Sequence, residues 1–231
     1  MKIGVLIPAH NEAEHIGSLL KAVRDLGMDI LVIDDGSTDH TSAVALQNGA
    51  KLIRNEQKRG KGYSLRRGFA QMLSEGYDGI VTMDGDGQHD PADLQKFIDA
   101  AREHPTSVII GNRMGRARGM PLIRYLTNRI MSSLISLFCR INIPDTQCGY
   151  RYIPSAVLRA IHLTSGDFEI ETEILMRAAK QGFAIFSVPV KTIYRDEESK
   201  IHPGKDTLRF LIYFIREVSH REKFSNRGKH D

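Results

Sequence analysis

Short β-rich runs alternate with amphipathic helical patterns from Met1 to Ile110. The runs rich in aliphatic and β-branched residues predict strands at residues 2–7, 30–33, 51–53, 79–83 and 107–110. Between them, apolar residues recur at helical spacing, for example at Ile16, Leu19 and Val23. Strands and helices that alternate in this way favour a mostly parallel sheet with helices on both faces. The sequence therefore predicts an α/β fold of the Rossmann-like kind.

Capping residues mark where two of these helices begin. Asn11 can cap the first helix, with Glu14 reaching back as in a capping box, and Gly27 can end it. Asp90 precedes Pro91, a pair that is typical of a cap followed by the first turn of a helix. Both pairs predict a helix that starts directly after a polar loop.

Beyond Asn112 the alternation gives way to longer helical patterns. A basic loop, "RMGRARGMP", precedes a helix predicted over residues 121–139. The further elements predicted are a helix over 171–180, a strand over 184–194 and an amphipathic helix over 206–219. With 231 residues, of which 41% are hydrophobic, the chain can bury a core. We predict one domain over residues 1–205, followed by an amphipathic helix and a basic tail over 206–231.

Cysteine content and hydropathy bear on the compartment. The two cysteines, Cys139 and Cys148, exclude a disulfide framework and favour a reducing compartment. No signal-peptide pattern opens the chain, and the longest uncharged stretches, 130–139 and 210–215, fall short of the ~20 residues that span a bilayer. We expect a cytoplasmic protein. The helix over 206–219 suits peripheral contact with the cytoplasmic face of a membrane, and packing on the protein's own core is the alternative.

The net charge of +4 is mild, but the basic residues are clustered. One cluster consists of arginines between Arg113 and Arg140, and the other lies between Arg216 and Lys229. Such clusters suit phosphate ligands, anionic lipid or nucleic acid, and solubilising charge is the alternative for the second cluster. Because neither cluster has interleaved aromatic residues or a recognisable module, we expect no nucleic-acid binding.

Each unusual polar cluster in the first half of the chain follows a predicted strand. "PAHNE" follows the first strand, "DDGSTD" the second and "DGDGQHDP" the fourth. Ligands of parallel α/β sheets bind at the carboxyl ends of the strands. The sequence therefore predicts one ligand crevice that is assembled from three strand ends.

The acidic turn after the fourth strand suits a divalent cation. Asp84 and Asp86 are spaced to converge on one ion, and Mg²⁺ usually keeps only one or two protein carboxylates beside water and substrate phosphates. Gly85 and Gly87 let the backbone turn and let a ligand approach. A plain Asp/Gly turn is the alternative, and for Asp90 it is the preferred interpretation. We predict Mg²⁺ or Mn²⁺ bridging a diphosphate.

Other phosphate chemistries fit this turn less well. An Asp-x-Asp phosphatase nucleophile would lie near the chain start and precede Thr or Val, whereas here Gln88 follows the turn. The sequence has no Gly-x-Gly-x-x-Gly after the first strand and no Gly-Lys-Ser/Thr loop, which argues against a dinucleotide cofactor and against NTP hydrolysis. A nucleotidyltransferase would show a glycine-rich basic loop where this chain has "PAHNE".

The motifs "IPAHNE", "VIDDGSTD", "NEQKRGKGYSLRRGF", "MDGDGQHDP", "GNR" and "DTQCGYR" occur together in this order. Over Met1 to about Ile153 the chain resembles family-2 glycosyltransferases with the GT-A fold. Within that family it looks most like the dolichyl- and polyprenyl-phosphate mannosyl- and glucosyltransferases. The features that match this subgroup are Arg113, Arg124, Asn128 and "VPVKTIYRDEESKIHP". Many such enzymes carry transmembrane helices near the C-terminus, where this sequence shows an amphipathic pattern.

The resemblance implies an inverting, metal-dependent transfer of a sugar from a nucleotide sugar, of the GDP-mannose or UDP-glucose type, to a polyprenyl or dolichyl phosphate. Asp84, Asp86 and Gln88 would hold the metal and the diphosphate. The residues that would contact the nucleotide are Pro8, Ala9, Asn11, Glu12, Asp35, Gly60 and Lys61. Those that would bind the acceptor phosphate are Arg113, Arg124 and Asn128. Arg195 or Lys200 would close over the donor diphosphate.

The acceptor decides whether a general base is needed. A hydroxyl acceptor calls for a carboxylate base, whereas a phosphate monoester is already largely ionised near neutral pH, its second pKa being ~6. Asp145, Glu171 and Glu173 are the candidates, although "DFEIETEIL" equally suits an acidic helix start. A saccharide or other hydroxyl acceptor is thus the alternative to polyprenyl phosphate. A catalytically silent nucleotide-sugar-binding module is a third reading, which the intact acidic turn disfavours. The sequence leaves open the nucleotide base of the donor (uracil or guanine), the sugar that is transferred and the oligomeric state.

Overall fold

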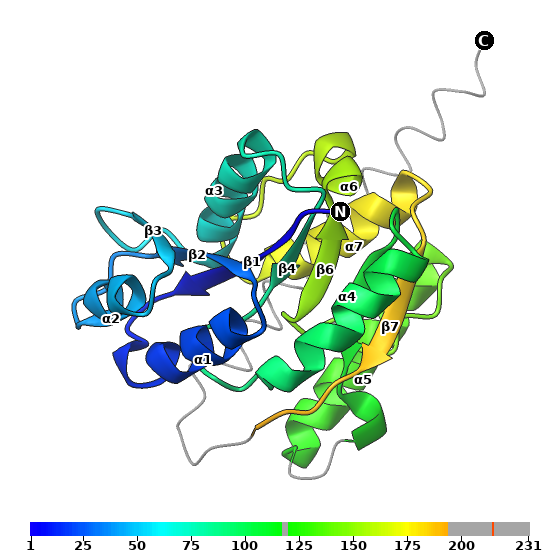
Figure 1. The fold of residues 1–231 in the computed structure, drawn as a ribbon. Coiled ribbons are helices and arrows are strands. Elements are labelled where there is room, and N and C mark those ends of the chain that lie inside the picture. Colours follow the sequence, from blue (N-terminus) through cyan, green and yellow to red (C-terminus); the bar gives the residue numbers. More distant parts are fainter. Residues whose placement is uncertain (117–119, 194–213, 215–231) are drawn as a thin grey trace. The chain divides into compact units, whose positions relative to one another are not determined.

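The computed structural model describes residues 1–116, 120–193 and 214 of the chain. Within these residues, seven strands form one sheet in the order β3-β2-β1-β4-β6-β5-β7, with helices on both faces (Figure 1). Every neighbouring pair is parallel except the two pairs that contain β6, which confirms the predicted α/β fold. The strands are β1 (Ile3–Ala9), β2 (Asp29–Asp34), β3 (Lys51–Arg54), β4 (Gly79–Thr82), β5 (Val108–Asn112), β6 (Arg151–Pro154) and β7 (Ile185–Pro189).

The helices pack on the sheet through the alternating side chains of its strands. Val5 and Ile7 of β1 belong to the core cluster that contains Phe97, whereas Leu6 points to the other face. On that other face, a Cβ added at Gly68 would lie 2.3 Å from Leu6 Cδ1. The helix that carries Gly68, α3 (Lys61–Ser74), therefore packs directly on the sheet. The helices are α1 (Ala13–Asp25), α2 (Thr41–Gln47), α3 (Lys61–Ser74), α4 (Leu94–Glu103), α5 (Leu122–Cys139), α6 (Ser155–Ala160) and α7 (Glu169–Lys180).

The start of α1 differs from the prediction. Its N-cap is Glu12, without a capping hydrogen bond from that side chain, and not Asn11. Asn11 adopts a positive φ of 55°, and its side chain accepts from Thr38 N at 2.8 Å. The capping-box prediction was wrong because the Asn11 side chain joins two loops instead of closing the helix. The second cap is confirmed, since Asp90 Oδ1 accepts from Ala92 N at 3.0 Å.

Sequence patterns missed β6, α2 and α6. The four residues of β6 are all buried, and they include an arginine and a proline. An apolar/polar alternation cannot be seen in a strand that is buried on both faces and carries a charge. The predicted strand over 184–194 is also shorter in the structure, where β7 ends at Pro189.

The antiparallel direction of β6 matters for the site. Arg151, the first residue of β6, pairs with Thr82 near the end of β4 and with Ile110 of β5. The chain that enters β6 therefore arrives at the edge where the parallel strands end. This places "DTQCGY" beside the three predicted loops.

Several predictions fall outside the described residues. They concern Arg195, Lys200, the helix over 206–219 and the domain boundary at residue 205. Among the described residues, no helix combines the length and the apolar character that a membrane span requires.

Candidate active site

The loops after β1 and β2 are fastened to each other. Asn11 N donates to Ser37 Oγ at 2.9 Å, and Glu12 N donates to Thr41 Oγ1 at 2.8 Å. The acidic turn after β4 lies against the first loop, because a Cβ at Gly85 would be 3.3 Å from Ala9 Cβ. The three polar clusters therefore meet at one edge of the sheet, as their positions in the sequence predict.

Asp35 fixes the loop that leads into α3. Its buried carboxylate accepts from Asn55 Nδ2 at 2.8 Å and from Arg59 N at 2.9 Å through Oδ1. Its Oδ2 accepts from Gly60 N at 2.8 Å. This sets the backbone immediately before Lys61, the first residue of α3. Asp35 thus shapes the crevice from within the protein.

The start of α3 is also packed against the loop that precedes α7. Gly60 has a φ of 96°, and a Cβ there would lie 2.5 Å from Gly166 O, so the close approach requires glycine. Glu173 anchors that loop by accepting from Thr164 N at 3.0 Å and from Ser165 N at 2.8 Å. Its side chain is 0% exposed. Glu173, which the sequence offers as a candidate base, is therefore buried and holds this loop in place.

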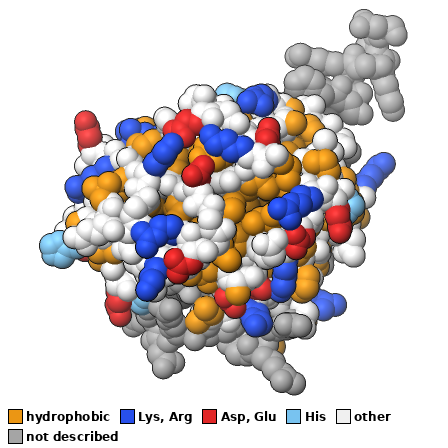
Figure 2. Space-filling model, in the orientation of Figure 1, with side chains coloured by type: hydrophobic (Ala, Val, Ile, Leu, Met, Phe, Trp, Pro, Cys, Tyr) orange, Lys and Arg blue, Asp and Glu red, His pale blue; other side chains and the backbone are white. Residues whose placement is uncertain are grey.

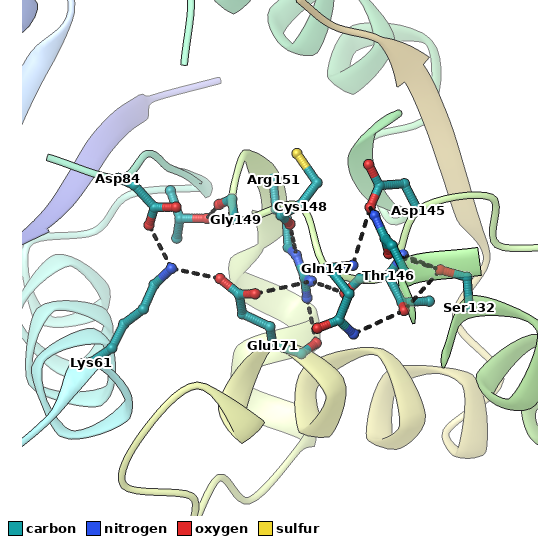
Figure 3. Close-up of polar contacts among 12 residues, drawn as sticks. Lys61, Asp84, Ser132, Asp145, Thr146, Gln147, Cys148, Gly149, Arg151 and Glu171 are labelled. Atoms are coloured by element: carbon teal, nitrogen blue, oxygen red, sulfur yellow. Dashed lines mark hydrogen bonds and ion pairs between the residues drawn. The ribbon is translucent and has the colours of Figure 1, made fainter. Parts of the chain in front are cut away.

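Lys61 lies between two carboxylates that come from distant parts of the chain (Figure 3). Its Nζ is 2.5 Å from Asp84 Oδ1 and 2.6 Å from Glu171 Oε1. Burial alone would lower the pKa of Lys61, but Asp84 and Glu171 raise it above its ordinary value. Arg151 Nη2 lies 3.9 Å from Glu171 Oε2, so Glu171 faces a second cation. The Lys61 ammonium therefore stays charged in this cluster.

Asp84 is ionised in this environment. Burial alone would raise the pKa of Asp84, but its cationic neighbours, above all Lys61, lower it to about 2. Asp84 N donates to Nδ1 of the buried His89 at 3.1 Å, which fixes the ring beside the turn. Burial is the largest influence on the imidazole and lowers the pKa of His89. The cluster thus pairs a permanent anion with a neutral histidine.

The donor set on this turn suits a hard divalent cation. The Asp84 and Asp86 carboxylates lie on one turn, and Gln88 N donates to Asp86 Oδ1 at 2.9 Å. Mg²⁺ and Mn²⁺ prefer such oxygen ligands, and the ammonium on Asp84 shows that this carboxylate attracts a cation. No group of three or more His, Cys, Asp or Glu side chains that could hold a metal occurs in the part of the chain that the structure describes. The residues fit an ion that takes further ligands from water and phosphate.

Arg113 is clamped by Asp145. Arg113 Nε donates to Asp145 Oδ2 at 2.8 Å and Nη2 donates to Oδ1 at 2.9 Å. Asn128 of α5 donates to the same Oδ1 at 2.9 Å. Burial alone would raise the pKa of Asp145, but Arg113 and Asn128 lower it. The buried carboxylate therefore holds Arg113 in one orientation.

The chain that enters β6 supplies site residues that sequence reasoning missed. A Cβ at Gly149 would lie 2.7 Å from Asp84 Oδ2 and 2.9 Å from Glu171 Oε1, so the backbone here closes the carboxylate cluster. Thr82 Oγ1 donates to Gly149 O at 2.7 Å and fixes this approach. Arg151 is 1% exposed and faces Glu171. The "CGYR" segment, in which a glycine lies just before a buried strand that begins with an arginine, was the available signal.

The predicted site residues divide into four groups. Asn11, Asp35 and Gly60 belong to the hydrogen-bonded loops of the crevice. Those that the structure brings together around the acidic turn are Pro8, Ala9, Glu12, Lys61, Asp84, Asp86, Gln88 and Glu171. Arg113, Asn128 and Asp145 form the second cluster, and Arg124 is half-buried on the helix that carries Asn128. Arg195 and Lys200 lie outside the described residues. His89, Gly149 and Arg151 are the additions.

Several solved structures share this arrangement of elements. Glucosyl-3-phosphoglycerate synthase from Mycobacterium tuberculosis, in complex with Mn²⁺, uridine diphosphate and phosphoglyceric acid, matches with a TM-score of 0.70 and 20% identity. The match covers 85% of this chain and 72% of that chain. The fold is therefore the GT-A fold of glycosyltransferases.

The sequence model of the family described as "Glycosyl transferase family 2" matches residues 4–161, and the chain belongs to this family. An undecaprenyl-phosphate mannosyltransferase of Micrococcus luteus is 33% identical over 220 residues, which cover 88% of this chain and 89% of the relative. A UDP-N-acetylglucosamine–dolichyl-phosphate N-acetylglucosaminyltransferase of Methanococcus voltae is 28% identical over 217 residues, which cover 84% of this chain and 86% of the relative. The chain is a glycosyltransferase that is most like the polyprenyl-phosphate sugar transferases.

Proposed function

We propose that this protein transfers a sugar from a nucleoside-diphosphate sugar to a polyprenyl phosphate, with inversion at the anomeric carbon. The relatives named for undecaprenyl and dolichyl phosphate support this acceptor. They differ in the sugar that they transfer, so the donor is proposed only as the GDP-mannose or UDP-glucose type. We also propose a cytoplasmic protein that works at the membrane surface, where such acceptors are found.

The observation that carries the acceptor proposal is that all three candidate bases are already bound to other groups of the protein. Asp145 is fully buried and holds Arg113, and Glu173 is fully buried and anchors the loop before α7. Glu171 forms an ion pair with Lys61 at 2.6 Å. A hydroxyl acceptor would need one of them as a base, whereas a phosphate monoester attacks without one because its second pKa is ~6.

The donor would lie against the acidic turn. A divalent ion held by Asp84, Asp86 and Gln88 would supply Lewis-acid stabilisation of the leaving diphosphate. Lys61 lies at the same carboxylate, where its ammonium can also compensate the charge on the diphosphate. The loops that carry Asn11 and Asp35 would receive the nucleoside. In the reaction a phosphate oxygen of the acceptor bonds to the anomeric carbon, the bond from that carbon to the donor diphosphate breaks, and the nucleoside diphosphate leaves.

The acceptor phosphate would lie near Arg113 and Arg124. Asp145 and Asn128 hold Arg113 in place, which orients the phosphate for in-line attack. Arg195 and Lys200 follow closely on Ile193, whose N donates to Gln88 O at 3.0 Å. This hydrogen bond ties the chain to the acidic turn and supports the proposal that one of these two side chains closes over the donor diphosphate.

A hydroxyl acceptor is the second candidate, and Glu171 favours it. Its carboxylate lies on the same ammonium as Asp84, and it would become a base if Lys61 moved to the donor. This reaction would release a proton to Glu171, which the phosphate reaction does not require.

The test is nucleoside-diphosphate release from a panel of UDP- and GDP-sugars. The reactions contain Mg²⁺, Mn²⁺ or a chelator, each with and without a short-chain polyprenyl phosphate. We expect release that requires both the metal and the lipid phosphate. Metal-dependent release that ignores the lipid phosphate but rises with a saccharide would replace the proposal with the hydroxyl acceptor. Absence of release with every donor would leave a binding module.

A further inference from the structure

The helix α5 presents an apolar stripe to solvent on the side that faces away from the site. Its exposed apolar residues are Leu122 (71% exposed), Ile123 (69%), Leu126 (49%), Ile130 (62%) and Leu137 (78%). At 100° per residue their positions fall within about 100° of the helix circumference. They therefore form one continuous stripe, which we call the α5 outer face.

The α5 outer face is distinct from the face that packs on the protein. The buried residues of the helix are Asn128, Met131, Ser132 and Ile135. Single exposed apolar residues such as Leu46 on α2 occur elsewhere and need no explanation, but a contiguous stripe marks an interaction surface.

The charged residues of α5 and of the segments that flank it are all of one sign. Between Asn112 and Asp145 every charged residue is an arginine. Arg129 and Arg140 are exposed on α5 itself and directly after it. In the view of the whole molecule in Figure 2, basic and acidic side chains are interspersed. A helix that combines an apolar stripe with exposed arginines and carries no acidic residue complements a surface that is apolar inside and anionic outside.

We propose that the α5 outer face docks on the surface of an anionic lipid bilayer. Its large apolar side chains would enter the boundary between headgroups and acyl chains, and Arg129 and Arg140 would contact the anionic headgroups. The opposite face of α5 carries Asn128, which binds the Asp145 that holds Arg113. Docking would place this cluster next to the membrane. The functional benefit of this placement rests on the proposed function, in which the acceptor is a lipid phosphate.

The test is cosedimentation of the full chain with vesicles. One vesicle contains phosphatidylcholine with phosphatidylglycerol and the other phosphatidylcholine alone. The triple variant Leu122→Gln/Ile130→Gln/Leu137→Gln changes residues that are 71%, 62% and 78% exposed, so the melting temperature should stay within about 2 °C of wild type. Leu46→Gln, at a residue that is 58% exposed on α2, is the matched control.

We expect the wild type and Leu46→Gln to bind anionic vesicles, with weaker binding to neutral ones. The triple variant should bind at least ten-fold more weakly. Wild-type binding that the triple variant retains, or a wild type that does not sediment, would overturn the proposal. A concentration-dependent dimer that the triple variant abolishes, without any loss of vesicle binding, would assign the face to a second copy instead.

Activity separates this inference from the proposed function. With a short-chain polyprenyl phosphate in detergent, the triple variant should turn over at the wild-type rate, because the outer face does not contact the site. Vesicle docking without transfer to the lipid phosphate would reject the proposed function and keep the docking face. Transfer with no docking by any variant would reject the docking face and keep the function.

Discussion

Two clusters of charged side chains lie at the edge of the same sheet, and they hold their cationic side chains in different ways. In the first cluster, Lys61 is shared between Asp84 and Glu171, and the Asp84 side chain is 28% exposed. In the second, the Asp145 side chain is 0% exposed and receives both Nε and Nη2 of Arg113.

The difference teaches which cluster can change its partners. An ammonium on a flexible stem is a point charge that can move to another anion, whereas a buried bidentate guanidinium is fixed in a plane. The first cluster therefore suits the exchange of Lys61 for a metal ion and a diphosphate. The second holds Arg113 in the orientation in which we propose that it binds the acceptor phosphate. Four predictions follow from this contrast.

The largest expected effect is on stability, at the fixed cluster. Asp145→Ala should lower the free energy of unfolding by about 3–5 kcal/mol, because it leaves the buried Arg113 guanidinium without its partner. Asp99→Ala is the matched control, since it breaks the exposed Arg102–Asp99 pair at 3.2 Å and should cost at most about 1 kcal/mol. Urea titration of both variants measures the difference. Equal losses would mean that Asp145 is not a buried anchor.

The exchangeable cluster should respond in turnover instead of stability. Asp86→Asn should lower kcat on the order of 10²–10³-fold, because it removes one of the two negative charges that hold the metal, while the melting temperature stays close to wild type. Asp25→Asn, at an exposed residue of α1, is the control and should leave kcat unchanged. Full activity of Asp86→Asn would remove the metal from the proposed mechanism.

A smaller loss is expected where the backbone closes the first cluster. Gly149→Ala would place a Cβ 2.7 Å from Asp84 Oδ2 and should shift both carboxylates, with a loss in kcat of up to about 10²-fold. Gly166→Ala is the control, because a Cβ there meets nothing within 4 Å. If the two variants have the same activity, the approach of Gly149 to the carboxylates has no role in turnover.

The smallest effect concerns acid stability. The pKa of Asp84 is lowered from 3.8 to about 2 in the folded protein. The contribution of this carboxylate to the free energy of unfolding is therefore present above pH 3.8 and is lost as the pH falls through about 2. That contribution is on the order of 2 kcal/mol. Lys61→Met removes the principal cation beside Asp84, so its metal-free stability should fall less than wild type between pH 5 and pH 2. If the difference in stability between Lys61→Met and the wild type stays constant from pH 5 to pH 2, the ion pair between Lys61 and Asp84 is contradicted.

Most of the fold could be predicted from the sequence because hydrophobic periodicity reports local structure. β6 could not, since Arg151 and Pro154 carry no alternation and its burial on both faces comes from long-range packing. The capping role of Asn11 failed for a related reason. Its side chain accepts from Thr38, which is distant in the sequence.

The site was predictable to the extent that it lies in strand-end motifs. "DGDGQHDP" gives Asp84 and Asp86 directly, but nothing local indicates that Lys61 bridges Asp84 and Glu171. The same holds for Asp145. Its sequence context allows a base, and only the burial and the two hydrogen bonds from Arg113 show an anchor.

The most direct test of the function proposed for these two clusters is the identity of the product. Wild-type protein, Mg²⁺, a nucleotide sugar that it hydrolyses or transfers and a short-chain polyprenyl phosphate are combined, and the lipid is examined by ³¹P NMR and mass spectrometry. We predict that the phosphate monoester becomes a phosphodiester whose mass has increased by one sugar residue. A lipid that remains a monoester while the sugar appears on a hydroxyl acceptor would contradict the proposed function.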